Sequence, residues 1–393
     1  MQKLLVLLII SAMVVICMYS VDVAQMIGVS LSATRWILGL ITVIVVVILI
    51  ASVPLLFPHP LLTRLEHEGN RPAVTQAEYA RLGLGPLPLS DSERDCYLDL
   101  LQRALTNVLY QDLSLMTYDR SRKAGLTEGF NLERRVEGED VPWLAHTMVG
   151  WKRLSNVRYC VETAITEDVP GDFVELGVLR GGASILMRGV VRAHGQTNRR
   201  VYACDTFVPR PKLSSFTRRF LLPVVSIFAS IPIPAFQRWI CSEFIRVSGS
   251  FPALDDPSEE LIGMTLFTLR HLDLTSYHRG TGLEDVKSNF ARYGLLDEQV
   301  IFLKGFFSET LPNASIKQLA LMRLDGDTFE STRDLLKLLY SKLSPGGFCI
   351  IDDYHSFSDC QRAVDRFREE QGITEELVQI DHHGVYWRKR VLN

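Results

Sequence analysis

The sequence predicts an α/β protein in which a parallel sheet is covered by helices on both faces, with two membrane-spanning helices ahead of it. Two observations lead to this prediction. From about residue 140 onward, short apolar runs typical of strands alternate with amphipathic runs typical of helices. Nearer the start of the chain, two apolar stretches without a charged residue are each long enough to cross a bilayer.

Composition narrows the class of protein. The chain has 393 residues, of which 47% are hydrophobic and 22% are charged, as expected of a folded protein. Its formal net charge of -3 shows no basic excess, so no nucleic-acid partner is expected. The seven cysteines are odd in number and lack C-x-x-C spacing, which argues against a zinc cluster or a disulfide framework and favours a reducing compartment.

The two apolar stretches, 4–21 and 37–57, predict a transmembrane helical hairpin over residues 1–57. Lys3 would also suit a cleaved signal peptide, but the first stretch exceeds the roughly 7 to 15 apolar residues of such a peptide, and no A-x-A site follows it. Buried core helices are the other alternative.

The charges that flank the hairpin predict its orientation. Lys3 precedes the first span, and Arg64 and Arg71 follow the second. Because basic residues favour the cytoplasmic side, the sequence predicts a multi-pass membrane protein whose remaining chain lies in the cytoplasm.

Three segments follow the hairpin. Residues 58–90 are rich in Pro, Gly and charge and are expected to form a linker. Residues 91–139 are expected to form a helical extension, with a helix over 93–110 whose leucines recur at helical spacing. The candidate caps of this helix are Ser90, Asp91 and Ser92. Residues 140–393 are expected to form the α/β domain.

The expected strands of this domain are 172–178, 200–207, 299–305, 319–326 and 347–354. The helices expected between them include 183–194, 282–293 and 330–341. In open sheets of this kind, ligands bind beyond the carboxyl ends of the strands, and the polar residues of this chain stand at those ends.

A glycine turn follows the first of these strands. Glu175 and Gly177 lead into Gly181 and Gly182, and a helix begins there. Glycines allow close approach of a ligand to the backbone, and the first amides of a helix attract anionic groups. An ordinary strand-to-helix turn is the alternative. The absence of G-x-G-x-x-G disfavours a dehydrogenase.

Asp205 closes the next strand, where an acid can accept hydrogen bonds from both hydroxyls of a ribose. A helix cap or a solvated loop acid is the alternative for this residue.

Four acids stand at the ends of the last two strands. Asp325 and Asp327 straddle Gly326, and Asp352 and Asp353 follow the next strand. If these strands are neighbours, the acids meet at one edge, where like charges would raise one another's pKa unless a cation joined them. Oxygen ligands suit Mg²⁺, and Asp327 is our candidate for the general base. A turn with a helix cap and a solvated loop are the alternatives.

Four histidines are other candidate bases. We expect a structural, hydrogen-bonded role for His146, and the same for His382 and His383, which precede a terminal strand-like segment. His355 is close enough in sequence to the acids to be a hydrogen-bond partner of a metal ligand.

From about residue 139 to 390 the chain resembles the macrocin O-methyltransferase (TylF-like) family, enzymes that use S-adenosylmethionine (SAM) and Mg²⁺ to methylate sugar hydroxyls in antibiotic biosynthesis. The stretches that carry the resemblance are "AHTMVGWKRLSNVRYCVE", "VPGDFVELGVLRGGASILMRG", "VKSNFARYGLLDEQVIFLKGFFSETLP", "RLDGDTFESTRDLLKLLYSKLSPGGFCIIDDY" and "GVYWRK". It implies the Rossmann-like class I SAM-dependent methyltransferase fold, with an antiparallel terminal strand.

The resemblance also assigns roles to particular residues. It implies that the SAM amino-acid portion is held by the glycine-turn residues, that Asp205 takes the ribose, and that Phe307 and Ser308 lie on the adenine side. The glycine-turn residues are Glu175, Gly177, Gly181 and Gly182. The implied metal ligands are Asp325, Asp352 and Asp353, with Asp327 as the base.

Two departures from the family concern the membrane. An insertion at residues 210–275 contains an apolar stretch broken by three prolines, and we interpret it as a lid or a membrane-surface element, with a packed helix as the alternative. The other departure is the hairpin. Together they predict SAM- and Mg²⁺-dependent O-methylation of a sugar or glycolipid-type acceptor at a membrane. Whether the chain forms a homo-oligomer is left open.

Two other functions compete with this one. The first is a membrane-anchored, non-catalytic binding or scaffold protein that retains the fold. The second is another nucleotide-dependent sugar-modifying enzyme, such as a dehydrogenase or a glycosyltransferase, because "DGD" is similar to a D-x-D metal motif.

Overall fold

The computed structural model describes residues 74–85, 92–118, 124–125, 129–207, 241, 262 and 280–391. The predicted hairpin over 1–57, most of the linker and almost all of the insertion lie outside these residues. Within the described part of the chain, no helix combines the length and the apolar character needed to span a membrane.

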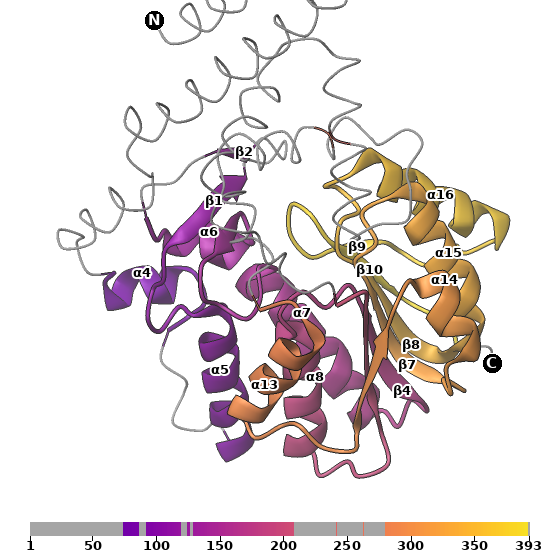
Figure 1. The fold of residues 1–393 in the computed structure, drawn as a ribbon, viewed down its shortest axis with the longest axis horizontal. Helices are drawn as coiled ribbons and strands as arrows, with labels where there is room; N and C mark the ends of the chain where they lie inside the picture. The colour runs from indigo at the N-terminus through magenta and orange to yellow at the C-terminus, as the bar shows by residue number, and fades with distance from the viewer. Residues whose placement is uncertain are drawn as a thin grey trace, which may run out of the picture. The chain divides into compact units, whose positions relative to one another are not determined.

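A seven-stranded sheet forms the centre of the fold, in the order β6-β5-β4-β7-β8-β10-β9 (Figure 1). The strands are β4 (Asp172–Leu176), β5 (Val201–Asp205), β6 (Val300–Lys304), β7 (Leu319–Leu324), β8 (Leu343–Ile351), β9 (Val378–Gln379) and β10 (Val385–Arg388). The first five strands in this order are parallel, and β10 pairs antiparallel with both β8 and β9. The predicted parallel sheet with an antiparallel terminal strand is confirmed.

The strand order reverses at β4, which has β5 on one side and β7 on the other. At such a reversal the connections leave toward opposite faces of the sheet, which opens a crevice at the carboxyl ends of the strands. The central strand β7 is buried along its whole length, as expected of a parallel strand covered on both faces.

Helices cover both faces of the sheet (Figure 1). One layer contains α5 (Glu93–Thr106), α7 (Gly150–Thr166), α8 (Gly182–Ala193) and α13 (Leu283–Arg292). The other contains α14 (Phe307–Thr310), α15 (Phe329–Leu339) and α16 (Ser358–Glu370), with short 3-10 turns at Leu311–Asn313 and Tyr340–Lys342. Alternate residues of each strand point to opposite layers, so that Phe173 and Leu321 belong to the first core and Val174 and Met322 to the second.

The helix at the start of the described domain begins where the sequence predicts. Ser92 caps α5, and its side chain accepts a hydrogen bond from the Asp95 backbone amide at 3.2 Å. The helix is about one turn shorter than expected, because Asn107 adopts a left-handed conformation with φ of 54°.

The predicted helical extension also contains a small sheet, which the sequence analysis missed. Besides α4 (Gln76–Arg81) and α6 (Leu132–Glu137), it has β1 (Ser114–Tyr118), β2 (Ala124–Gly125) and β3 (Asp140–Pro142), in the order β2-β1-β3. Arg135 holds this part together: its guanidinium lies 2.7 Å from Asp112 and 2.9 Å from Asp140, and all three residues are buried. Such buried ion pairs are stable only while both the guanidinium and the carboxylates are present.

We expect Arg135→Met to lower the free energy of unfolding by about 3–5 kcal/mol, because it leaves two buried carboxylates without their cation. Chemical denaturation of the full chain measures this loss. The control is Arg81→Met: Arg81 lies 3.6 Å from Glu133, both side chains are 62% exposed, and a change below about 1 kcal/mol is expected. Equal losses in the two variants would contradict the role given to Arg135.

Candidate active site

The glycine turn lies between β4 and α8, against the end of β7. Gly177 has φ of 92°, and a Cβ atom there would lie 2.6 Å from the Asp325 carbonyl oxygen. Gly181 has φ of 93° and caps α8 without a side-chain hydrogen bond. A Cβ on Gly182 would meet the His146 carbonyl oxygen at 2.6 Å. These three predicted residues therefore let the turn pack closely against the end of β7 and against residues 146 and 147, and other side chains would not fit at 177 or 182.

Asp205 joins the glycine turn to the end of β5. One carboxylate oxygen accepts hydrogen bonds from the amides of Val178 at 2.7 Å and Leu179 at 3.3 Å. The other oxygen accepts from the Phe207 amide at 2.9 Å. Asp205 thus fixes the turn, and its predicted contact with a ribose remains a prediction.

Phe307 and Ser308 begin α14, directly after β6. Phe307 is half-buried and packs on the second core, whereas Ser308 is exposed. The Gly305 amide donates to the Asp205 carbonyl oxygen at 3.0 Å, so the β6 end lies beside the β5 end. The predicted adenine-side residues therefore border the same strand ends as Asp205.

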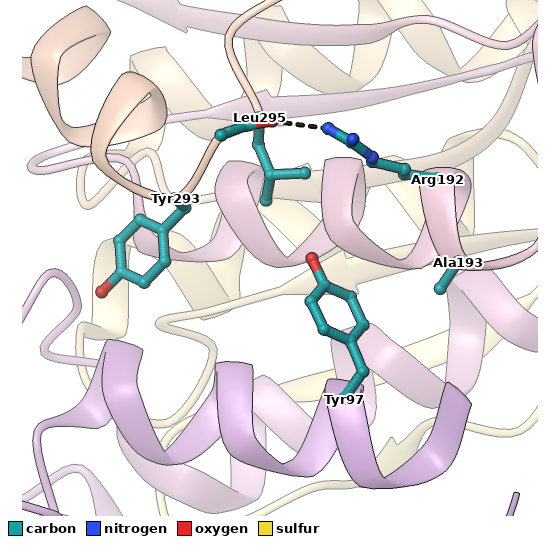
Figure 2. Close-up of a pocket in the computed structure, with 6 residues that line it drawn as sticks. Tyr97, Arg192, Ala193, Tyr293 and Leu295 are labelled. Carbon is teal, nitrogen blue, oxygen red and sulfur yellow. Dashed lines mark hydrogen bonds between the residues drawn. The ribbon is translucent and has the colours of Figure 1, made fainter. Parts of the chain in front are cut away.

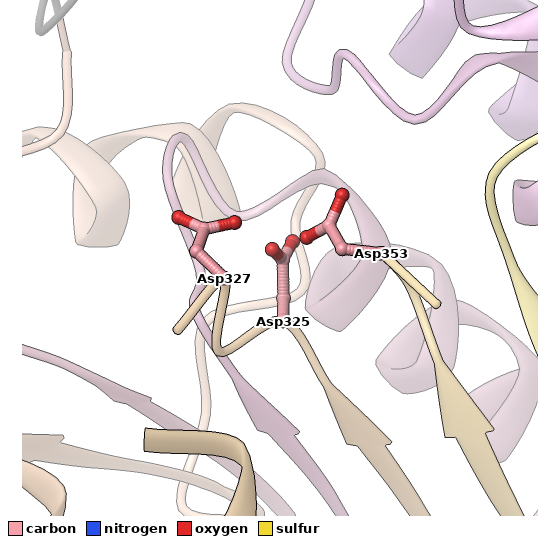
Figure 3. Close-up of side chains that lie close together, drawn as sticks. All are labelled: Asp325, Asp327 and Asp353. Atoms are coloured by element: carbon pink, nitrogen blue, oxygen red, sulfur yellow. The ribbon is translucent and has the colours of Figure 1, made fainter. Parts of the chain in front are cut away.

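Three of the four predicted acids converge. Asp325 and Asp327 follow β7, Asp353 follows β8, and one carboxylate oxygen from each lies within 4.8 Å of the others (Figure 3). Asp353 is buried, and the other two are half-buried. Asp327 has φ of 52°, a conformation that only a short polar side chain adopts readily outside glycine, and Thr328 then caps α15.

Asp352, the fourth acid, faces buried arginines. Its Oδ1 atom lies 2.6 Å from Arg323 Nη2, and its Oδ2 atom contacts Arg153. Arg153 in turn lies 2.9 Å from Asp381. Asp352 Oδ1 receives no hydrogen bond of acceptable geometry despite this ion pair, so it is a buried oxygen with accepting capacity left.

Arg323 is the centre of this network, and the sequence analysis missed it. Its guanidinium also lies 2.8 Å from Glu175 and 3.1 Å from Asp325. Glu175 uses its second oxygen to accept from Ser184 on α8. The signal that could have identified Arg323 is its position inside the apolar run "LALMRLDG", because a charge within a buried strand needs partners.

Burial has the largest effect on the pKa values of these acids. Loss of hydration raises the pKa of Glu175 to about 7, although Arg323 and Ser184 oppose the rise. Burial also raises the pKa of Asp325 well above its usual range, and the charges of Asp352 and Asp353 add to the effect. The ionised form of Asp325 is therefore unfavourable beside the other acids, and a cation bound among them would stabilise it.

The donor set fits a hard divalent cation. All three converging atoms are carboxylate oxygens, the ligand type that Mg²⁺ prefers. Asp352 is outside this group, and both of its oxygens lie in ion pairs with Arg323 and Arg153. The assignments of Asp325, Asp352 and Asp353 as ligands and of Asp327 as base remain predictions.

The histidines lie as follows. His146 Nδ1 is hydrogen bonded to the Tyr293 hydroxyl at 2.7 Å, and His383 is buried beside Ser356 at 3.2 Å. Both have the structural surroundings expected from the sequence. His355 is exposed and stacks edge-on against Tyr354, and His382 is half-buried.

A hollow of about 430 Å³ lies elsewhere on the domain (Figure 2). Its lining residues are Tyr97, Arg192, Ala193, Tyr293, Gly294 and Leu295. Arg192 closes one side by donating to the Gly294 carbonyl oxygen at 2.6 Å. Because the hollow borders the C-terminal end of α8, about 16 Å along the helix from Gly182, it is separate from the glycine turn.

An open α/β sheet with a glycine turn at its reversal point and acids on the neighbouring strands defines the class I methyltransferase fold. Comparison with known proteins gives the family: the model of Macrocin-O-methyltransferase (TylF) matches residues 94–218 and 247–389, more than half of the chain. The chain belongs to this family and is an O-methyltransferase. The match begins earlier than expected, so the extension is part of the family's domain. The unmatched residues 219–246 fall within the predicted insertion.

Two curated relatives are similar over most of the chain. The 8-demethyl-8-(2,3-dimethoxy-alpha-L-rhamnosyl)-tetracenomycin-C 4'-O-methyltransferase of Streptomyces olivaceus is 41% identical over 305 residues, 76% of this chain and 95% of that enzyme. The mycinamicin III 3''-O-methyltransferase of Micromonospora griseorubida is 39% identical over 297 residues, 75% of this chain and 96% of that enzyme. The solved structure of the O-methyltransferase NovP has 37% identity and a TM-score of 0.56, and the match covers 76% of this chain and 100% of that one.

His146 predicts a pH dependence of stability. Burial, aided by Arg292 and Arg180, lowers the pKa of His146 to about 4, against about 6.5 in the unfolded chain. The stability contributed by the neutral ring is therefore present above pH 6.5 and is lost as the pH falls toward 4.

The variant His146→Asn retains a hydrogen-bonding atom for Tyr293 but does not titrate. As the pH falls over this interval, we expect its free energy of unfolding to decrease by up to about 2–3 kcal/mol less than that of the wild type. Denaturation at pH 7.5 and pH 4.5 measures the difference. Parallel losses in both proteins would show that His146 is not the group responsible.

Proposed function

We propose that this protein is a SAM- and Mg²⁺-dependent O-methyltransferase that methylates a hydroxyl group of a sugar. The observation that carries the proposal is the convergence of Asp325, Asp327 and Asp353 next to the glycine turn of β4. The relatives support a sugar acceptor, because one of them is the 4'-O-methyltransferase of a rhamnosyl-tetracenomycin.

The donor would bind over the glycine turn. Gly177 and Gly181 hold the turn at positive φ directly before α8, and the positive end of that helix's dipole suits the carboxylate of the amino-acid end of SAM. Asp205 would bind the ribose hydroxyls, and Phe307 and Ser308 border the same strand ends, which suits the adenine ring. These contacts would leave the sulfonium methyl facing the acidic edge.

The acceptor hydroxyl would meet this methyl group at the acids. Asp325, Asp353 and Asp352 would hold a divalent cation, which lowers the free energy needed to develop negative charge on a bound hydroxyl oxygen. Asp327 would take the hydroxyl proton on its carboxylate, since it is half-buried and lies among the converging oxygens. The strand ends would hold both partners at attack distance, which would remove much of the entropic barrier.

The test of this proposal separates the base from the ligands. We expect Asp327→Asn to lower methyl transfer by about 100-fold or more, because the proton acceptor is gone, while binding of Mn²⁺ falls by less than about tenfold. We expect Asp325→Asn to abolish both. Labelled SAM with a glycosylated acceptor measures transfer, and titration calorimetry measures Mn²⁺ binding.

The control is Asp334→Asn on α15, a half-buried acid paired only with Arg333 among the described ion pairs, and it should change neither quantity. If Asp327→Asn retains transfer, Asp327 is not the base. If wild-type protein binds no divalent cation, the metal part of the proposal is wrong.

We further propose that the acceptor is membrane-associated, as a lipid-linked sugar, a glycolipid or a surface polysaccharide. This rests on the sequence of the segments outside the described residues: the apolar stretches 4–21 and 37–57, and the insertion 210–275 with its prolines. The catalytic domain would then lie on the cytoplasmic side of the membrane.

The preference for a membrane-associated acceptor can be tested with the full chain and with a variant that lacks residues 210–275. The methyl-transfer activity of each protein is measured on a soluble sugar and on the matched lipid-linked sugar. We expect the full chain to prefer the lipid-linked sugar by about tenfold or more, as an effective-concentration effect, and deletion to remove that preference. Equal activity in all four combinations would refute it. Soluble-acceptor activity serves as the control for folding of the deletion variant.

A further inference from the structure

The strand register gathers four charged residues on one face of the sheet. Glu175 on β4 pairs with Arg323 on β7, and Arg323 pairs with Ile350 on β8. Asp325 stands two residues beyond Arg323, and Asp352 stands two residues beyond Ile350, so all of them point to the same face. The face is the one covered by α7 and α8.

Arg323 contacts each of the three acids. It lies 2.8 Å from Glu175, 3.1 Å from Asp325 and 2.6 Å from Asp352, and only 1% of the residue is exposed. The described ion pairs of Glu175 and Asp325 both go to Arg323. No other arginine in the described residues joins three strands in this way.

The acids on β7 and β8 need such a partner to stay oriented. Neighbouring strands are about 4.8 Å apart, so the carboxylates of Asp325 and Asp352 repel each other across that gap. Each would rotate away from the other in the absence of a cation between them. A planar guanidinium donates along fixed directions, and it can therefore set the direction of several carboxylates at once.

We propose that Arg323 is a positioning residue for methyl transfer, which fixes the directions of the Asp325 and Asp352 carboxylates and ties both to Glu175 at the cofactor strand. The inference rests on the proposed function, since orientation of these acids matters through the cation they would hold. Because Arg323 is 1% exposed, it would act on the reaction through these carboxylates and not by touching the acceptor.

Arg323→Lys separates orientation from charge. Lysine keeps one positive charge but loses the planar fork, so a role limited to charge compensation would survive the change. We expect the affinity for Mn²⁺ alone to fall by about 10–100-fold, the usual effect of losing a residue that orients metal ligands. Titration calorimetry of the full-length protein measures it, with the thermal midpoint recorded in parallel.

Arg135→Lys is the matched control. Arg135 is also 1% exposed and also joins two buried acids, but it lies in the extension, and its described ion pairs go to Asp112 and Asp140 and not to the acids of β7 and β8. We expect it to lower the thermal midpoint without changing Mn²⁺ affinity. Unchanged Mn²⁺ affinity in Arg323→Lys, or equal losses in both variants, would overturn the positioning role.

A second variant keeps the inference testable if Arg323→Lys does not fold. Glu175→Gln keeps the side-chain shape and weakens one of the three contacts of Arg323, so Mn²⁺ affinity should fall severalfold although Glu175 is outside the group of converging acids. No change in this variant would overturn the role. If wild-type protein binds no Mn²⁺, the metal proposal fails and the positioning role fails with it.

Discussion

The carboxyl edge of the sheet depends on a buried chain of alternating charges: Glu175, Arg323, Asp352, Arg153 and Asp381. Each charge alone would lose several kcal/mol of hydration on burial, so none is stable there without its neighbours. The two arginines let three acids be buried beneath the crevice, and the crevice then retains negative charge where a reaction can use it. Removal of one member leaves the others uncompensated.

The backbone around this chain is equally constrained. Gly177 lies so close to the end of β7 that no side chain fits, and the turn it begins is fixed by Asp205. The turn proposed for the donor and the acids proposed for the metal are therefore built from adjacent strands in direct contact. Their relative position is set by the strand register rather than by a flexible loop, which favours the constant geometry that transfer between two bound molecules requires.

Much of the fold could be predicted because its signals are local. The alternation of apolar runs located all five central strands, and the polar ends of those strands included Asp205, Asp325 and Asp353. The charge partners could not be found in the same way. Arg323 meets Glu175 across 148 positions of sequence, and such pairing depends on strand order, which periodicity does not contain. The strands of the extension were missed because they are short, and their apolar and polar residues show little alternation.

Arg153 and Asp381, which close the charge chain at one end, are 228 positions apart in the sequence. Contacts of such long range form late in folding, because the entropy of closing the loop must be overcome before the contact contributes. During synthesis, the acidic crevice stays incomplete until the segment that carries Asp381 has been made and has docked. The same segment carries Val385 and Trp387 of β10, which are buried in the second core, so the acidic edge and that core are completed together at the end of synthesis.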